Sequence, residues 1–187
     1  MNRGRMLTLV MAVGWLAAIG GAASSPQDKQ DKYSVKVPGG LAFAEFRGYE
    51  SWQAISISRT EKLIAVILGN PEMIAAYEAG IPANGKPVPD GARMAKIHWL
   101  PKQNQFFPLA TVPGTQVNVD FMVKDSKRFA DSGGWGYAVF DYDAKADRFT
   151  PGTEAGTPPQ GNDAKCGFAC HVLAQSRDYV FTEYGKR

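Results

Sequence analysis

Apolar and polar residues alternate along residues 116–123, and this pattern limits the possible folds more than any other feature. Successive side chains of an extended strand project to opposite faces, so one face here carries Val117, Val119, Phe121 and Val123. The other face carries Asn118, Asp120 and Met122. Short apolar segments elsewhere predict further strands at 52–58, 63–68, 92–100 and 136–142. No heptad pattern supports a helical bundle, so the chain is expected to be rich in strands.

Helices are expected to be few and short. Asn70 supplies an N-cap side chain and Pro71 suits a first helical turn, which predicts a helix that continues through Tyr77. Residues 151–163 are rich in Pro and Gly and predict a loop. A second short helix is expected after this loop, ending near Gln175.

Composition indicates a globular domain and argues against a nucleic-acid partner. The chain has 187 residues, with 21 Lys and Arg against 18 Asp and Glu. The formal charge of +3 is small and is not gathered into a basic block.

The N-terminal residues have the pattern of an export signal. Arg3 and Arg5 precede an apolar run at 6–20, which small residues follow. The run is shorter than the roughly 20 residues of a membrane-spanning helix, although an uncleaved anchor is the alternative. We therefore expect a periplasmic protein with a signal peptide over 1–23 that is cleaved near Ala23, a flexible leader over 24–36 and one domain over 37–187.

The two cysteines of the chain, Cys166 and Cys170, directly precede a histidine, His171. In c-type haem attachment, two thiols bond to the porphyrin and the adjacent imidazole ligates the iron. The usual spacing has two residues between the thiols, whereas three lie between them here. The motif predicts one covalently bound haem with His171 as the iron ligand, and a short-loop disulfide is the alternative. Since His98 is the one other histidine, a zinc site would need carboxylate ligands.

Four segments together resemble the cytochrome P460 family. They are PDGARMAK at 89–96, VKDSKRF at 123–129, GWGYAVF at 134–140, and the cysteine–histidine motif followed by DYVFT at 178–182. The resemblance implies an α+β fold, predominantly antiparallel β-sheet with a few short helices, in a single haem-binding domain that forms a homodimer. Members of this family are exported haem proteins that oxidise hydroxylamine. Their relatives, the cytochromes c′-beta, bind nitric oxide in a hydrophobic pocket.

The resemblance also implies roles for individual residues. Lys96 aligns with a lysine that members of the family cross-link to a meso carbon of the porphyrin. Asp120 aligns with an acidic residue on the open side of the haem, where a carboxylate would accept protons during oxidation of the substrate. The implied catalytic residues are Asp120 and Lys96. The implied haem-binding residues are Cys166, Cys170, His171 and Lys96, with His171 as the metal ligand.

Neighbouring residues leave another function open. A shift of one residue in the alignment would put Phe121 or Met122 over the iron in place of Asp120, which would favour gas binding. Met94 or Met122 as a sixth ligand would indicate electron transfer, and His98 is a structural histidine, a sixth ligand or a proton relay. The leading hypothesis is a mono-haem cytochrome that oxidises hydroxylamine or nitric oxide and passes electrons to a redox partner protein. The alternative binds nitric oxide or shuttles electrons without turnover.

Overall fold

The structure is a computed structural model that describes residues 29–187. The expected signal peptide over 1–23 and the first part of the expected leader, 24–28, lie outside the described residues. Among residues 29–187, no helix has both the length and the apolar character to span a membrane.

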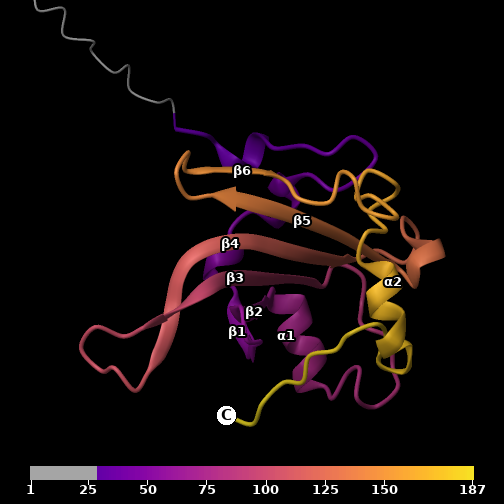
Figure 1. The fold of residues 1–187 in the computed structure, drawn as a ribbon. Coiled ribbons are helices and arrows are strands. Elements are labelled where there is room, and N and C mark those ends of the chain that lie inside the picture. The colour runs from indigo at the N-terminus through magenta and orange to yellow at the C-terminus, as the bar shows by residue number, and fades with distance from the viewer. Residues whose placement is uncertain (1–28) are drawn as a thin grey trace, which may run out of the picture.

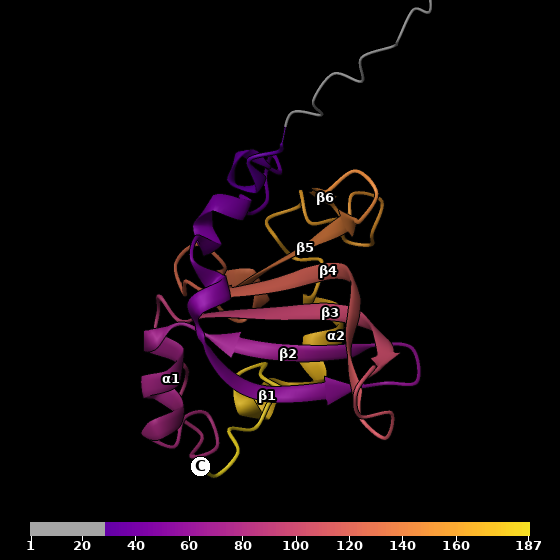
Figure 2. The same ribbon diagram turned by 90° about the vertical axis from the view of Figure 1, so that its left-hand side faces the viewer.

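One antiparallel sheet of six strands organises the domain, and its strands are joined in chain order from one edge to the other. Figure 2 shows this order directly. The strands are β1 (Gln53–Arg59), β2 (Ile64–Gly69), β3 (Arg93–Gln103), β4 (Thr111–Lys124), β5 (Trp135–Asp143) and β6 (Arg148–Pro151). The α-helices are α1 (Pro71–Glu78) and α2 (Phe168–His171). The 3-10 helices are η1 (Lys32–Ser34), η2 (Phe43–Phe46), η3 (Tyr49–Ser51), η4 (Ala130–Ser132) and η5 (Val172–Arg177). This architecture confirms the expected α+β fold.

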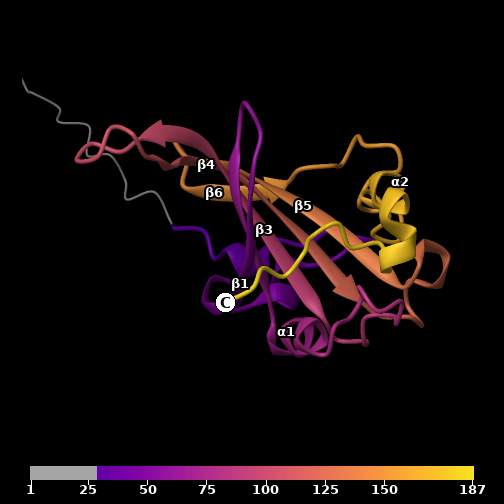
Figure 3. The same ribbon diagram turned by 90° about the horizontal axis from the view of Figure 1, so that it is seen from below.

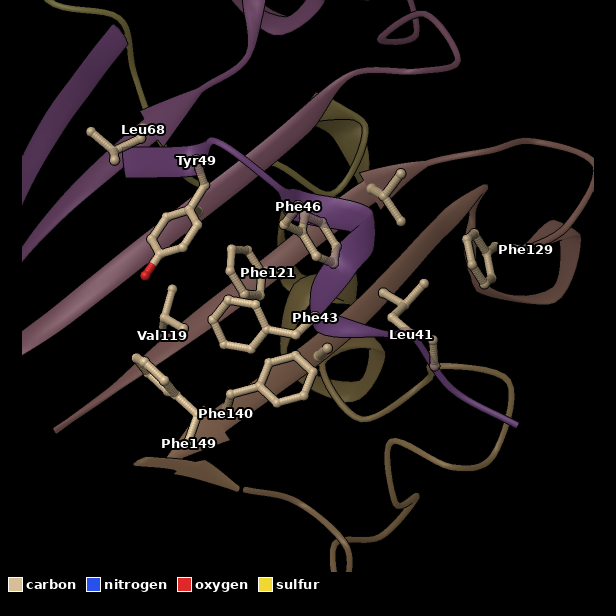
Figure 4. Packing of buried hydrophobic residues seen from close by; sticks show 14 residues of the cluster. Leu41, Phe43, Phe46, Tyr49, Leu68, Val119, Phe121, Phe129, Phe140 and Phe149 are labelled. Atoms are coloured by element: carbon tan, nitrogen blue, oxygen red, sulfur yellow. The ribbon is translucent and has the colours of Figure 1, made fainter. Parts of the chain in front are cut away.

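The N-terminal segment covers one face of the sheet with a core of aromatic side chains. Phe43 and Phe46 of η2 are fully buried, and the Phe46 ring stacks on that of Phe121 with centroids 4.1 Å apart. Val119 of β4 and Phe140 of β5 complete this cluster from the sheet (Figure 4). The apolar side of the alternating strand therefore faces the core, as its pattern predicts.

The opposite face of the sheet lies against α1 and the C-terminal segment (Figure 2). Met73 of α1 and Val180 of the C-terminal segment are buried against this face with Trp135. Asn70 caps α1 as predicted, because its Oδ1 accepts a hydrogen bond of 3.1 Å from the backbone N–H of Met73. Polar residues of β3 and β4 share this face, so the C-terminal segment and these residues are brought together here.

Two strands extend beyond the predicted ranges. β3 continues to Gln103 and β4 begins at Thr111, so the two form a long hairpin whose turn lies far from α2 (Figure 1 and Figure 3). The extension of β4 was not predicted, because Pro113 and Gly114 are unfavourable in strands and interrupt the strand pattern.

The strand β6 was not anticipated, and the leader contributes to its edge. The Gln30 side chain donates a hydrogen bond of 2.9 Å to the backbone carbonyl of Phe149 and accepts one of 2.7 Å from its N–H. Tyr33 and Val35 pack against the aromatic core. Residues 29–36 of the expected leader thus contact the sheet within the described part of the chain.

Candidate functional site

A cavity of about 450 Å³ lies on the face of the sheet that the C-terminal segment covers. Lys96 of β3 and Asp120 of β4 both line it and are paired directly opposite one another in the sheet. Cys166 and His171 line the same cavity. The structure therefore brings together four of the five predicted site residues, although they are separated by as many as 75 positions in the sequence.

The pairing of Lys96 with Asp120 follows from the register of the strands. Antiparallel strands place directly opposed side chains on the same face, and β3 and β4 keep one continuous register from Arg93 to His98. Ile67 on β2 and Val139 on β5 flank the pair, and both line the cavity. The charged pair is thus bordered by apolar side chains.

The cysteine motif reaches the cavity because Gly167 permits a close approach to the sheet. A Cβ atom on Gly167 would lie 2.5 Å from the ring of Tyr137. The Cys166 Sγ is half-buried and lies 3.5 Å from the backbone carbonyl oxygen of Tyr137, and burial raises the pKa of this thiol. Cys170, the fifth predicted site residue, is exposed on α2, and the two cysteines are free thiols.

His171 has one ring nitrogen fixed by the C-terminal segment. Its Nδ1 lies 2.7 Å from the backbone carbonyl oxygen of Tyr179, so Nδ1 carries the proton and Nε2 is left as the free nitrogen. The ring lies between those of Tyr137 and Phe181, with centroid distances of 4.9 and 5.0 Å. Burial lowers the pKa of His171, which favours the neutral imidazole. A neutral imidazole with a free Nε2 is the form that ligates metals.

Asp120 is a carboxyl group with few partners. Its Oδ1 is buried without a hydrogen bond, and 37% of its side-chain surface is accessible, on the wall of the cavity. Burial raises the pKa of Asp120 to about 6, Lys96 opposes this shift and Asp141 adds to it. Such a carboxyl group changes its protonation state near neutral pH and is suited to accept protons.

His98 stands beside this pair without lining the cavity. Its Nδ1 is buried and lies 3.6 Å from the Asp120 Oδ2, which is longer than a hydrogen bond. Burial and the charge of Lys96 lower the pKa of His98. The side chain is only 10% exposed, so His98 is a buried neighbour of Asp120 rather than a group that faces the cavity.

The apolar candidates separate onto the two faces of the sheet. Phe121 has its ring in the aromatic core among Phe43 and Phe46, so the register directs Asp120 rather than Phe121 toward the cavity. Met94 and Met122 are opposed on β3 and β4, and both line the cavity.

Several residues around the site were not singled out from the sequence. Lys124 is 5% exposed and its Nζ lies 2.9 Å from both carboxylate oxygens of Asp178. Tyr137 packs on the motif, and its hydroxyl is buried without a hydrogen-bond partner. Lys124, Tyr137 and Asp178 lie in the segments 123–129, 134–140 and 178–182, which carry the resemblance to the family. Only the fold shows that these three segments meet around the site.

The comparison with protein families settles the relationship. The model of the cytochrome P460 family matches residues 46–182, which is most of the chain. This chain belongs to the cytochrome P460 family. A search of curated protein sequences finds no match. Family membership makes the chain a haem protein of the cytochrome P460 type.

The cavity fits the haem of a cytochrome P460. Its volume is within the range of roughly 300–1,000 Å³ that small-molecule and cofactor sites occupy. Cys166 and His171 lie at its wall, and the buried Tyr137 hydroxyl and Asp120 Oδ1 are unpaired polar atoms beside it. No group of three or more His, Cys, Asp or Glu side chains within residues 29–187 is arranged to hold a metal ion directly. In a haem protein, by contrast, the porphyrin supplies four of the iron ligands and a single histidine is enough.

Proposed function

We propose that this cytochrome P460 is a periplasmic mono-haem protein that oxidises hydroxylamine and passes the electrons to a redox partner. One observation carries the proposal: Lys96 and Asp120 face the cavity that Cys166 and His171 also line. A protein that only carries electrons has no need of an ionisable carboxyl group on that wall. By resemblance to the family, we also propose that it is a homodimer.

The motif residues would attach and ligate the haem. Cys166 and Cys170 would each hold the porphyrin through a thioether bond to a vinyl group, with the thiol hydrogen on the neighbouring vinyl carbon. His171 would ligate the iron through Nε2, because Nδ1 is bonded to the Tyr179 carbonyl. Gly167 allows the longer cysteine loop to lie against Tyr137.

Lys96 would bond to the porphyrin edge through Nζ. The new nitrogen–carbon bond replaces one hydrogen on the amine and one on the porphyrin carbon, so a two-electron oxidant such as a peroxide is required. A nitrogen substituent at that position would conjugate with the ring and pull it out of shape, and distortion of the macrocycle is one of the means by which a protein changes haem electronics. Its position on β3, directly opposite Asp120 on β4, places Lys96 on the cavity wall.

Asp120 would act as the proton acceptor. Bound haem supplies an iron that accepts the electrons of the substrate. Oxidation of hydroxylamine releases one proton for each electron removed, and a general base must take these protons. With a pKa raised by burial to about 6, Asp120 is ionised at neutral pH and remains basic enough for this role.

The alternative function is nitric-oxide binding without turnover. The apolar side chains Ile67, Met94, Met122 and Val139 on the cavity wall favour it. A neutral diatomic gas needs no base, so under this hypothesis Asp120 would be dispensable.

An absorption spectrum of the oxidised and reduced protein, exported from a host that attaches c-type haem, tests the proposal. Lys96→Ala is the test variant, and Lys102→Ala is the control because Lys102 is an exposed lysine on the same strand. We expect a ferrous Soret band shifted far to the red in the wild type and in the control, but not in Lys96→Ala. An ordinary c-type spectrum in all three proteins would rule out the cross-link.

Turnover separates the two functions. With hydroxylamine and an artificial electron acceptor, we expect steady reduction of the acceptor by the wild type. A protein that binds nitric oxide tightly but does not reduce the acceptor would belong to the gas-binding class.

A further inference from the structure

The C-terminal segment turns sharply just after η5, and this turn supplies the acceptor for His171. Asp178 and Tyr179 both have left-handed backbone conformations, with φ of +49° and +64°. Such conformations are unfavourable for residues other than glycine, and two in succession persist only where the surroundings hold them. The carbonyl of Tyr179 points to the His171 Nδ1 because of this turn.

An ion pair between Lys124 and Asp178 holds the turn. Lys124, at the end of β4, is 5% exposed, and the Asp178 side chain is 13% exposed. The Lys124 Nζ donates to both carboxylate oxygens of Asp178 at 2.9 Å and to the Gly133 carbonyl at 2.9 Å. All three ammonium donors therefore have acceptors, as a buried charge requires.

Asp178 is also bound by two elements other than β4. The backbone N–H of Val88 donates to its Oδ2 at 2.8 Å, and the Trp135 Nε1–H donates to its backbone carbonyl at 2.8 Å. The loop before β3, the end of β4 and the start of β5 therefore all converge on this residue.

Gly133 couples the ion pair to Tyr179. Its carbonyl accepts from Lys124, and a Cβ atom at this position would lie 2.1 Å from the Tyr179 ring. Gly133 has φ of +69°, so the backbone also favours glycine here. The same short segment thus accepts from the lysine and packs on the residue whose carbonyl faces His171.

We propose that Lys124 and Asp178 are positioning residues that hold the Tyr179 carbonyl against the His171 Nδ1 and thereby set the strength of the histidine as an iron ligand. The effect on iron rests on the proposed function, whereas the orientation of His171 does not. Neither residue touches the cavity. Lys124 acts on Asp178, and Asp178 acts through the adjacent Tyr179, whose carbonyl oxygen lies 2.7 Å from the His171 Nδ1.

The direction of the effect follows from hydrogen bonding. A carbonyl that accepts a hydrogen bond from Nδ1–H polarises this N–H bond and makes Nε2 more basic. It also fixes the rotation of the ring. Loss of this bond weakens the iron–histidine bond. A weaker electron donor stabilises ferric iron less, so the reduction potential becomes more positive.

Two single variants of the holoprotein test this proposal. Asp178→Asn keeps the shape and tolerates the left-handed backbone but removes the charge. Lys124→Met removes the ammonium group. We expect the iron–histidine stretching band in the resonance Raman spectrum of the ferrous protein to move to lower frequency in both variants, and the reduction potential to rise.

Asp147→Asn is the matched control. Asp147 has φ of +48° and is exposed in the turn between β5 and β6, so the same substitution occurs in the same conformation away from the cavity. Its band and potential should equal those of the wild type. An unshifted band in both Asp178→Asn and Lys124→Met would overturn the proposal.

A double variant separates positioning from stability. Lys124→Met with Asp178→Asn leaves no unpaired buried charge, so its thermal unfolding temperature should recover relative to that of either single variant. The band should nonetheless stay at lower frequency. If the band returns with the unfolding temperature, the pair has only a structural role and the proposal is wrong.

A second measurement does not depend on haem. The chain has two histidines, so nitrogen NMR of histidine-labelled protein resolves His171 with little ambiguity. If the wild type carries no haem, the proposed function fails. The positioning proposal then still predicts an Nδ1-protonated His171 in the wild type and a mixture of tautomers in Asp178→Asn. A single unchanged tautomer in both would contradict it.

Discussion

The side chain of Asp120 shows what the sequence does and does not determine at the scale of a residue. The alternation along 116–123 predicts that Asp120 lies on the face opposite to the aromatic core, and the structure confirms this. The strand that contains Lys96 was also predicted. That the two residues are directly opposed depends on the register of a long hairpin, which no local pattern specifies.

Replacement of Asp120 should remove the base. Burial raises the pKa of Asp120 to about 6, so in the wild type the rate of hydroxylamine oxidation should rise as the pH increases through that value and the carboxylate becomes ionised. We expect Asp120→Asn to lower the rate at pH 7 roughly 100-fold or more and to abolish this rise. A pH–rate profile of both proteins is the measurement. An unchanged rate in the variant would exclude Asp120 as the base.

The same substitution should stabilise the fold at neutral pH. A folded-state pKa raised from 3.8 to about 6 means that ionisation opposes folding. This cost is absent below pH 4 and fully present above pH 6. The shift corresponds to roughly 3 kcal/mol, reduced to about 1–2 kcal/mol because 37% of the side chain is accessible.

Urea unfolding at pH 4 and pH 7 provides the check. Asp120→Asn should be more stable than the wild type at pH 7, and the difference should shrink toward zero at pH 4. A difference that is equal at both pH values would show that the carboxyl group is not destabilised by burial.

At the scale of elements, local signals determine where α1 begins. Asn70 is 3% exposed, and its Oδ1 accepts from the N–H groups of Met73 and Arg93 at 3.1 and 2.8 Å. Its Nδ2 donates to the Gly91 carbonyl at 2.9 Å. The sequence predicts the cap, but the bonds to Gly91 and Arg93 join α1 to β3 and depend on the tertiary fold.

Asn70→Ala should destabilise the protein by about 1–2 kcal/mol, because the cap is lost and the half-buried N–H of Arg93 loses its acceptor. Asn70→Asp keeps the acceptor oxygen for Met73 and Arg93, so we expect a smaller loss. Thermal unfolding of the three proteins measures both effects. Equal losses in the two variants would show that the Nδ2 hydrogen bonds to Gly91 and Glu72, rather than the cap, account for the contribution of Asn70 to stability.

The strand β6 shows why other elements were not predicted. It has four residues, from Arg148 to Pro151, and it follows a turn that begins after Asp143. Such a strand is too short for an alternating pattern, and its pairing with β5 and with the Gln30 side chain provides the stability that its own sequence lacks.

At the scale of the molecule, the sheet separates the hydrophobic core from the candidate functional site. One face holds the aromatic core under the N-terminal segment (Figure 4). The other face is covered by the C-terminal segment (Figure 2) and holds the cavity. The sequence predicts two-faced strands, but it does not show which terminal segment covers which face. That assignment depends on long-range contacts, such as those of Phe46 with Phe121 and of Asp178 with Lys124.

This division predicts that stability and haem chemistry can be changed independently. Phe43 is fully buried and contacts the rings of Phe121, Phe140 and Phe149. Phe43→Leu removes part of a side chain whose complete truncation costs about 3–5 kcal/mol, so we expect a loss of about 1–2 kcal/mol. Because the sheet lies between Phe43 and the cavity, the absorption spectrum and the hydroxylamine turnover at room temperature should be unchanged. Denaturant unfolding and turnover of the same preparation test both statements, and a loss of turnover in fully folded Phe43→Leu protein would show that the two faces are coupled through the sheet.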